Sequence, residues 1–109
     1  MNRRQDPRFP TELTGILTDF DEPETRLSVY VEDVSEGGVR LAMAEALECG
    51  AFVRLEVADS TLFCEVKYCN RGAAAYTAGL LVERVLIGAS ELGRLIEKLL
   101  DGSALSRRV

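Results

Sequence analysis

Apolar and polar side chains alternate one by one over several short stretches of the chain. In residues 53–57, for example, Val, Leu and Val alternate with Arg and Glu. A repeat of two residues is typical of strands that bury one face and expose the other. The same pattern predicts six strands, within residues 13–17, 27–31, 39–43, 53–57, 62–68 and 76–82. Residues that favour turns separate these stretches, so we expect a small antiparallel barrel or sandwich.

The repeat changes near the C-terminus, where apolar residues recur three and four positions apart. They are Leu92, Leu95, Ile96, Leu99 and Leu100, which would form one stripe along a helix. Ser90 can cap the beginning of this helix, and Gly102 can end it. Gly93 lies inside the helix, where glycine costs about 1 kcal/mol relative to alanine, so we expect a close contact there. The stripe is expected to cover the barrel's own core, and the alternative is an interface with a second copy or a partner.

Length and charge narrow the class of protein. A chain of 109 residues fits one domain. It contains no apolar run of the roughly 18 residues that a membrane span needs, and no apolar segment of a signal peptide follows the N-terminus. We therefore expect a cytoplasmic protein without a membrane span. The net charge of −5 disfavours binding to polymeric nucleic acid.

Catalytic chemistry has little support in the composition. The chain contains no histidine, which removes Ser-His-Asp and Cys-His catalysis and most zinc sites. Cys49, Cys64 and Cys69 lack a metal-type spacing and are expected to be buried, reduced thiols. An enzyme would have to use Glu32, Asp33 and Glu36 as an acid–base set, or Cys64 or Cys69 as a nucleophile. No base partner supports such a site, so we expect no catalytic residue, no metal and no cofactor.

Two short segments carry candidate binding chemistry. The first, residues 3–10, holds Arg3, Arg4 and Arg8 together with Pro7 and Pro10. The prolines favour an extended arm over a helix. Arginine offers a planar fork of donors that suits phosphates and guanine edges. The alternative is a solubilising tail.

The second segment, residues 32–39, follows a predicted strand and contains Asp33, Ser35 and Gly38. An Asp can accept hydrogen bonds from the N1–H and N2–H₂ edge of a guanine, and a Ser can bond beside it. The glycines permit positive φ and let a ligand approach the backbone. The alternative is an ordinary hairpin turn. Asp33 shares the parity of the core residue Val31 but is expected to be exposed, which a β-bulge near Glu32 would explain.

Taken together, these segments resemble the PilZ domain family. The resemblance rests on Arg4-x-x-x-Arg8, on Asp33-x-Ser35-x-x-Gly38, and on strands followed by a terminal helix. It implies a six-stranded antiparallel PilZ-type β-barrel with a C-terminal α-helix, which binds the bacterial second messenger cyclic di-GMP. The implied organisation is a flexible arginine arm at residues 1–10, the barrel and helix at 11–102, and a tail at 103–109.

The resemblance also implies roles for single residues. Arg4 and Arg8 would wrap the ligand, while Asp33, Ser35 and Gly38 would hold one guanine. Tyr68 stands where many family members have an aromatic residue, often Trp, and would stack on a base; the alternative is an ordinary barrel aromatic. Arg3 precedes the arginine motif, and an arginine there goes with a stacked pair of ligands rather than one.

The function that follows is that of a receptor without catalysis of its own. Binding of cyclic di-GMP would change the conformation of the N-terminal arm and relay the signal to an unidentified output protein for motility, pili or exopolysaccharide. The alternative is a PilZ-type adaptor that binds proteins and no nucleotide. Both a monomer and a homodimer are compatible with the sequence.

Overall fold

The computed structural model describes residues 8–101, in which six strands precede one helix. The strands are β1 (Phe9–Asp19), β2 (Glu22–Ser35), β3 (Gly38–Met43), β4 (Phe52–Val57), β5 (Ser60–Arg71) and β6 (Tyr76–Leu86), and the helix is α1 (Glu91–Asp101). The predicted fold class is confirmed. Several strands are longer than predicted, because the β1–β2 hairpin continues into exposed residues that show no apolar alternation.

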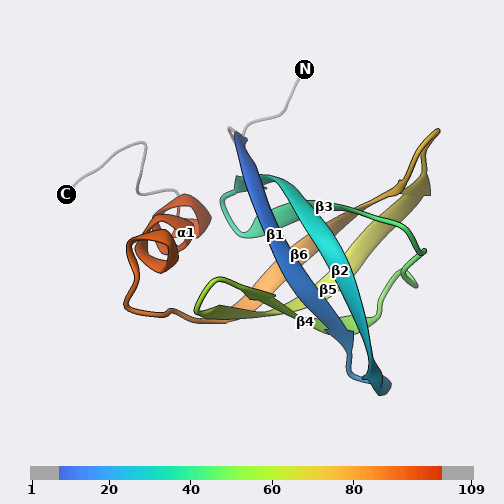
Figure 1. Cartoon of the computed structure of the whole chain (residues 1–109), viewed down its shortest axis with the longest axis horizontal. Coiled ribbons are helices and arrows are strands. Elements are labelled where there is room, and N and C mark those ends of the chain that lie inside the picture. The colour runs from blue at the N-terminus through green and yellow to red at the C-terminus, as the bar shows by residue number, and fades with distance from the viewer. Residues whose placement is uncertain (1–7, 102–109) are drawn as a thin grey trace.

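The strands close into a barrel in the order β1-β2-β3-β6-β5-β4. Figure 1 shows β1 and β2 as one long hairpin and α1 to one side of the strands. All neighbours are antiparallel, and β4 returns to pair with β1, where Leu17 lies opposite Leu55. Closure pairs each strand on both sides over part of its length, and residues 9–15 of β1 and 22–28 of β2 pair only with each other's strand. Alternate side chains therefore point either into one enclosed core or onto the outer surface.

The inward positions form this core. The fully buried members include Leu41, Val53, Leu55 and Val66, each with no exposed surface. Burial of one such side chain stabilises the fold by about 1.5–3 kcal/mol. Cys64 belongs to the same cluster, and its burial raises the pKa of the thiol to about 12. The expectation that all three cysteines are buried is wrong for Cys49, which lies exposed in the β3–β4 connection.

The helix α1 forms as the sequence predicts. The Gly93 amide donates to Ser90 Oγ over 2.9 Å, which caps the first turn. A Cβ on Gly93 would lie 2.8 Å from the Gly88 carbonyl oxygen, so the expected close contact is present. Ile96, Leu99 and Leu100 join the barrel core, and Leu92 packs partly against it. The apolar stripe therefore mainly covers the barrel's own core.

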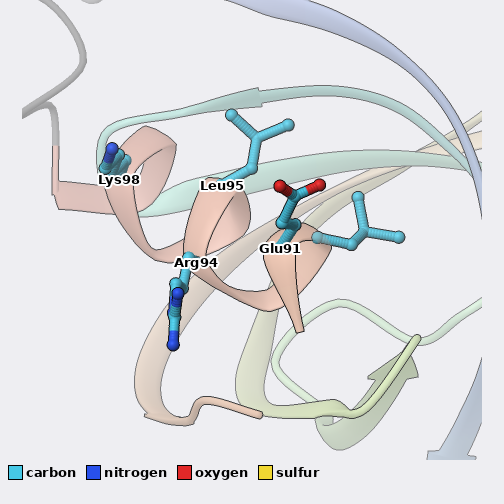
Figure 2. Close-up of a pocket in the computed structure, with 5 residues that line it drawn as sticks. Glu91, Arg94, Leu95 and Lys98 are labelled. Carbon is cyan, nitrogen blue, oxygen red and sulfur yellow. The ribbon is translucent and has the colours of Figure 1, made fainter. Parts of the chain in front are cut away.

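One residue of the stripe departs from this expectation. Leu95 is 48% exposed, and it lines a hollow of about 490 Å³ beside the helix. The other lining residues described are Glu91, Leu92, Arg94 and Lys98. Figure 2 labels Glu91, Arg94, Leu95 and Lys98 on α1. No helix within residues 8–101 is long and apolar enough to cross a membrane.

The start of β1 differs from the expected arm. The expectation that Phe9 and Pro10 belong to the arm is wrong, because both lie in β1 and pair with Val34 and Asp33 of β2. Phe9 also packs against the core, and this burial stabilises the first residue of the strand. Proline is tolerated because it lies at the start of the strand, beside an irregular register. Arg3 and Arg4, Gly102, which is expected to end the helix, and the tail at 103–109 lie outside the described residues.

Candidate functional site

The end of β2 changes its parity at a β-bulge. Val31 pairs with Leu41 on β3, but the next pair is Asp33 with Arg40, so Glu32 is the extra residue. Val31 and Val34 both point into the core, and Asp33 and Ser35 share the other face. The predicted bulge near Glu32 is therefore confirmed. It turns a core strand into one that presents two polar side chains on the outer surface of the barrel.

Asp33 lies between two arginines. Arg8 Nε donates to Asp33 Oδ1 over 2.6 Å, and Arg40 Nη2 approaches Asp33 Oδ2 to 2.5 Å. Arg8 Nη1 also donates to Ser35 Oγ over 3.2 Å. These neighbours leave Asp33 and Ser35 only 4% exposed, so the expected exposure of Asp33 is wrong. The carboxylate faces outward but is covered by charged partners, which compensate its burial.

Arg40 is a site residue that the sequence reasoning did not single out. Desolvation alone would lower the pKa of its guanidinium, but the nearby Asp33 carboxylate outweighs it and the pKa is raised. Arg40 Nε also lies 3.6 Å from Glu32 Oε1. A signal for Arg40 was available, because a polar residue two positions after Gly38 must face outward beside the end of β2.

The turn between β2 and β3 depends on its two glycines for different reasons. Gly37 has a φ of 74°, in the left-handed region that favours glycine. Positive φ is not found at Gly38. A Cβ there would instead lie 3.2 Å from the Leu80 carbonyl oxygen of β6, so glycine permits a close approach of two strands.

Gly37 also joins this turn to two other elements. Its amide donates to the Leu100 carbonyl oxygen at the end of α1, over 2.8 Å. Its own carbonyl oxygen accepts from the Val82 amide of β6, also over 2.8 Å. The candidate binding turn is therefore hydrogen bonded to the helix and to β6 through a single residue.

Tyr68 lies over the backbone of β6. It pairs across the strands with Gly79, and a Cβ on Gly79 would stand only 2.1 Å from Tyr68 Cε2. The ring therefore occupies the space that any other residue at position 79 would fill. Tyr68 remains 40% exposed, so one side of the ring is available to a ligand.

These elements meet at a hollow of about 200 Å³ on the outer surface of the barrel. The described residues that line it are Arg8, Glu36, Gly37, Gly38, Val39, Lys67, Tyr68, Gly79, Leu80 and Leu81. The structure thus places the predicted Arg8, Gly38 and Tyr68 at one hollow, with Asp33 and Ser35 held beside it by Arg8. The larger hollow beside α1 contains none of the predicted site residues.

Lys67 and Gly79 are further members that sequence reasoning left out of the site. Lys67 Nζ lies 3.7 Å from Glu65 Oε2 and is 54% exposed, which leaves it accessible to an anion. The hollow therefore combines arginine and lysine donors, an exposed aromatic ring and glycine backbone. Such a set suits a ligand with phosphates and a planar base. Within residues 8–101, no group of acidic or cysteine side chains is arranged to hold a metal ion.

Comparison with known proteins identifies the fold and the family of this chain. The fold is similar to that of the Bacillus subtilis inhibitor of motility (MotI/DgrA), with a TM-score of 0.64 and 18% identity. That match covers 99% of this chain but 55% of the solved one, so the chain spans about half the length of that structure. Curated proteins give no match. Because the family model of the PilZ domain matches residues 2–97, this chain belongs to the PilZ domain family.

Proposed function

We propose that this chain is a receptor for cyclic di-GMP that passes the signal to another protein. PilZ domains are a family of cyclic di-GMP receptors and adaptors rather than enzymes. The observation that carries the proposal is the position of Arg8, which bonds to Asp33 and Ser35 at the rim of the hollow beside Tyr68.

Binding would proceed by an exchange of partners at Asp33. In the structure described, Arg8 and Arg40 each take one oxygen of the carboxylate. A guanine edge offers two donors that can replace Arg8 at Oδ1, while Arg40 keeps its hold on Oδ2. The carboxylate stays compensated throughout, so no buried charge is left alone.

The released Arg8 is well placed to bind the incoming ligand. Its side chain is 41% exposed, whereas that of Asp33 is 6% exposed, so Arg8 is the partner free to move. A guanidinium can form paired hydrogen bonds with a phosphate or with the O6 and N7 atoms of guanine. Tyr68 would stack on a base, and Lys67 would approach a phosphate.

The arm and the number of ligands are part of the same proposal. Arg3 and Arg4, which belong to residues 1–7, would close over the ligand. This closure would change the surface that the chain presents to a partner. With Arg3 beside the motif, two stacked cyclic di-GMP molecules per chain are expected at saturation. Two stacked ligands bring four phosphates together, and the additional arginine offsets that charge.

Calorimetric titration with cyclic di-GMP tests the proposal, with GTP and cyclic GMP as competing ligands of related chemistry. The wild-type chain should bind cyclic di-GMP with high affinity and should bind GTP and cyclic GMP much more weakly. Arg8→Ala should weaken the binding of cyclic di-GMP. Arg94→Ala is the matched control, because Arg94 is an exposed arginine on α1 away from the site. Absence of cyclic di-GMP binding by the wild-type chain would refute the receptor function.

One observation favours the alternative of an adaptor that binds no nucleotide. Both oxygens of Asp33 already have arginine partners, so the turn is complete as a structural element without ligand. In that case Arg8→Ala would change stability and leave no nucleotide affinity to lose. The similar solved structure is an inhibitor of motility, and a motility output is one of those we propose here.

A further inference from the structure

A row of outward-facing side chains crosses five strands of the barrel away from the candidate ligand site. Thr18 of β1 lies opposite both Arg26 of β2 and Arg54 of β4. Arg54 in turn lies opposite Phe63 of β5, which lies opposite Arg84 of β6. The neighbours of these residues along each strand, such as Leu17, Leu55 and Leu62, are buried in the core. The row therefore lies on the outer surface.

Three phenylalanines gather at this row. Phe20 and Phe52 are 49% and 53% exposed, and the Phe20 amide donates to the Phe52 carbonyl oxygen over 3.1 Å. The centroids of the Phe20 and Phe63 rings are 6.1 Å apart. We call Phe20, Phe52, Phe63, Arg54 and Arg84 the aromatic–arginine face. Aromatic residues and arginine are enriched at the centres of protein interfaces, and exposed apolar patches mark interaction sites.

Two polar atoms at this face lack a hydrogen-bond partner although they are buried. Thr18 is only 3% exposed, and its Oγ1 has no hydrogen-bond partner. The Nε atom of Arg54 is also buried and has no hydrogen-bond partner. Buried polar groups in folded proteins nearly always have partners. The partly exposed guanidinium of Arg54 could donate to an oxygen-bearing group from outside.

The charge of the face points to an acidic occupant. Arg26 lies 3.8 Å from Glu56, but Arg54 and Arg84 form no ion pair with any residue in the described part of the chain. Two uncompensated guanidinium groups thus stand among exposed phenylalanines in a protein of net charge −5. A carboxylate beside an apolar side chain matches this combination of charge and surface.

We propose that the aromatic–arginine face docks an output protein through an acidic, partly apolar segment. A carboxylate of that segment bonds to Arg54, and a neighbouring apolar side chain packs on Phe20 and Phe63. The face shares no residue with the hollow that Tyr68 lines, but β5 runs through both. Docking can therefore be tested without nucleotide, and its outcome is separate from that of cyclic di-GMP binding.

Short fluorescent peptides of identical aliphatic and aromatic content, carrying no, two or four carboxylates, probe this face by fluorescence anisotropy. Affinity for the wild-type chain should rise with the number of carboxylates. Arg54→Gln and Arg84→Gln should each weaken binding of the most acidic peptide by roughly tenfold. Phe63→Ala should weaken the binding of all three peptides, because it removes a ring on which their apolar side chains would pack. Arg94→Gln, an exposed arginine on α1, is the matched control and should leave the affinities unchanged.

Equal affinities for the three peptides would overturn the proposal, as would undiminished binding in both Arg54→Gln and Arg84→Gln. Loss of binding in Arg94→Gln, with binding retained in Arg54→Gln and Arg84→Gln, would also overturn it and would place the contact at the hollow beside α1. Sedimentation of the wild-type chain tests whether a second copy of the chain occupies the face instead. A dimer that Arg84→Gln dissociates would show that a second copy, rather than an output protein, covers the face.

Discussion

Replacement of Gly79 by alanine adds one methyl group beneath the ring of Tyr68, and we expect it to weaken cyclic di-GMP binding. The added carbon would stand 2.1 Å from Tyr68 Cε2 and 2.6 Å from Cζ. Favourable contacts between carbon atoms require about 3.5–4.0 Å, so the ring must leave its place on β6. The ring is 40% exposed and can swing toward solvent, which keeps the cost to folding near 1 kcal/mol.

The magnitude follows from the stacking that a displaced ring can no longer provide. Stacking of a base on an aromatic side chain contributes about 1–3 kcal/mol, so affinity should fall by roughly 5- to 150-fold. Tyr68→Ala removes the ring outright and should cost about the same. Tyr68→Phe is the control, because it keeps the ring and removes only the hydroxyl.

Calorimetric titration of Gly79→Ala, Tyr68→Ala and the double variant forms a cycle that separates two causes. If the methyl group acts by moving the ring, it has nothing to move in the Tyr68→Ala background, and the double variant should match Tyr68→Ala. The reasoning would be refuted if Gly79→Ala weakened binding equally in both backgrounds. Unchanged affinity in Gly79→Ala together with an unchanged melting temperature would also refute it.

Three further outcomes are expected. Arg8→Ala should weaken cyclic di-GMP binding by about 1.5–3 kcal/mol in calorimetry, which is the usual contribution of charge-assisted hydrogen bonds. The free energy of unfolding in denaturant should fall by less than about 1 kcal/mol, because Arg8 is partly exposed. Gly37→Ala should destabilise the fold by about 1–2 kcal/mol because its φ is 74°, whereas Gly37→Asn should cost less, as thermal unfolding can show. Hydrogen bonds from the Ser90 side chain and amide lower the pKa of Asp59, so its stabilising effect is complete above the unfolded value and is lost as pH falls through the lower folded value. Asp59→Asn should remove that acid-side decrease in melting temperature, and an unchanged pH profile would contradict this assignment.

Local patterns in the sequence were sufficient wherever the structure is decided by neighbours along the chain. The conflict in parity between Val31 and Asp33 predicted the bulge that the β2–β3 register contains. Ser90 and Gly93 likewise predicted the cap and the close contact of α1. In each case the physical cause lies within a few residues, so no tertiary information was required.

The features that escaped prediction depend on pairing between distant strands. Arg40 meets Asp33 only because of the register that follows the bulge, and Gly79 lies beneath Tyr68 only because β5 and β6 shift register between Val66 and Tyr68. The aromatic–arginine face requires closure of the barrel through β1 and β4. The exposure of Asp33 was misjudged for the same reason, since the arginines that cover it come from other strands or precede β1.

Gly37 gives the candidate ligand site a direct mechanical connection to α1. The proposed exchange of Arg8 for a guanine at Asp33 would take place at the end of β2, directly before the turn whose Gly37 amide donates to the Leu100 carbonyl oxygen. Leu100 is itself part of the barrel core, so the end of the helix cannot follow the turn without disturbing that packing. A closely packed core resists gradual deformation. Movement of the turn must therefore either break the Gly37–Leu100 hydrogen bond or shift α1 with it.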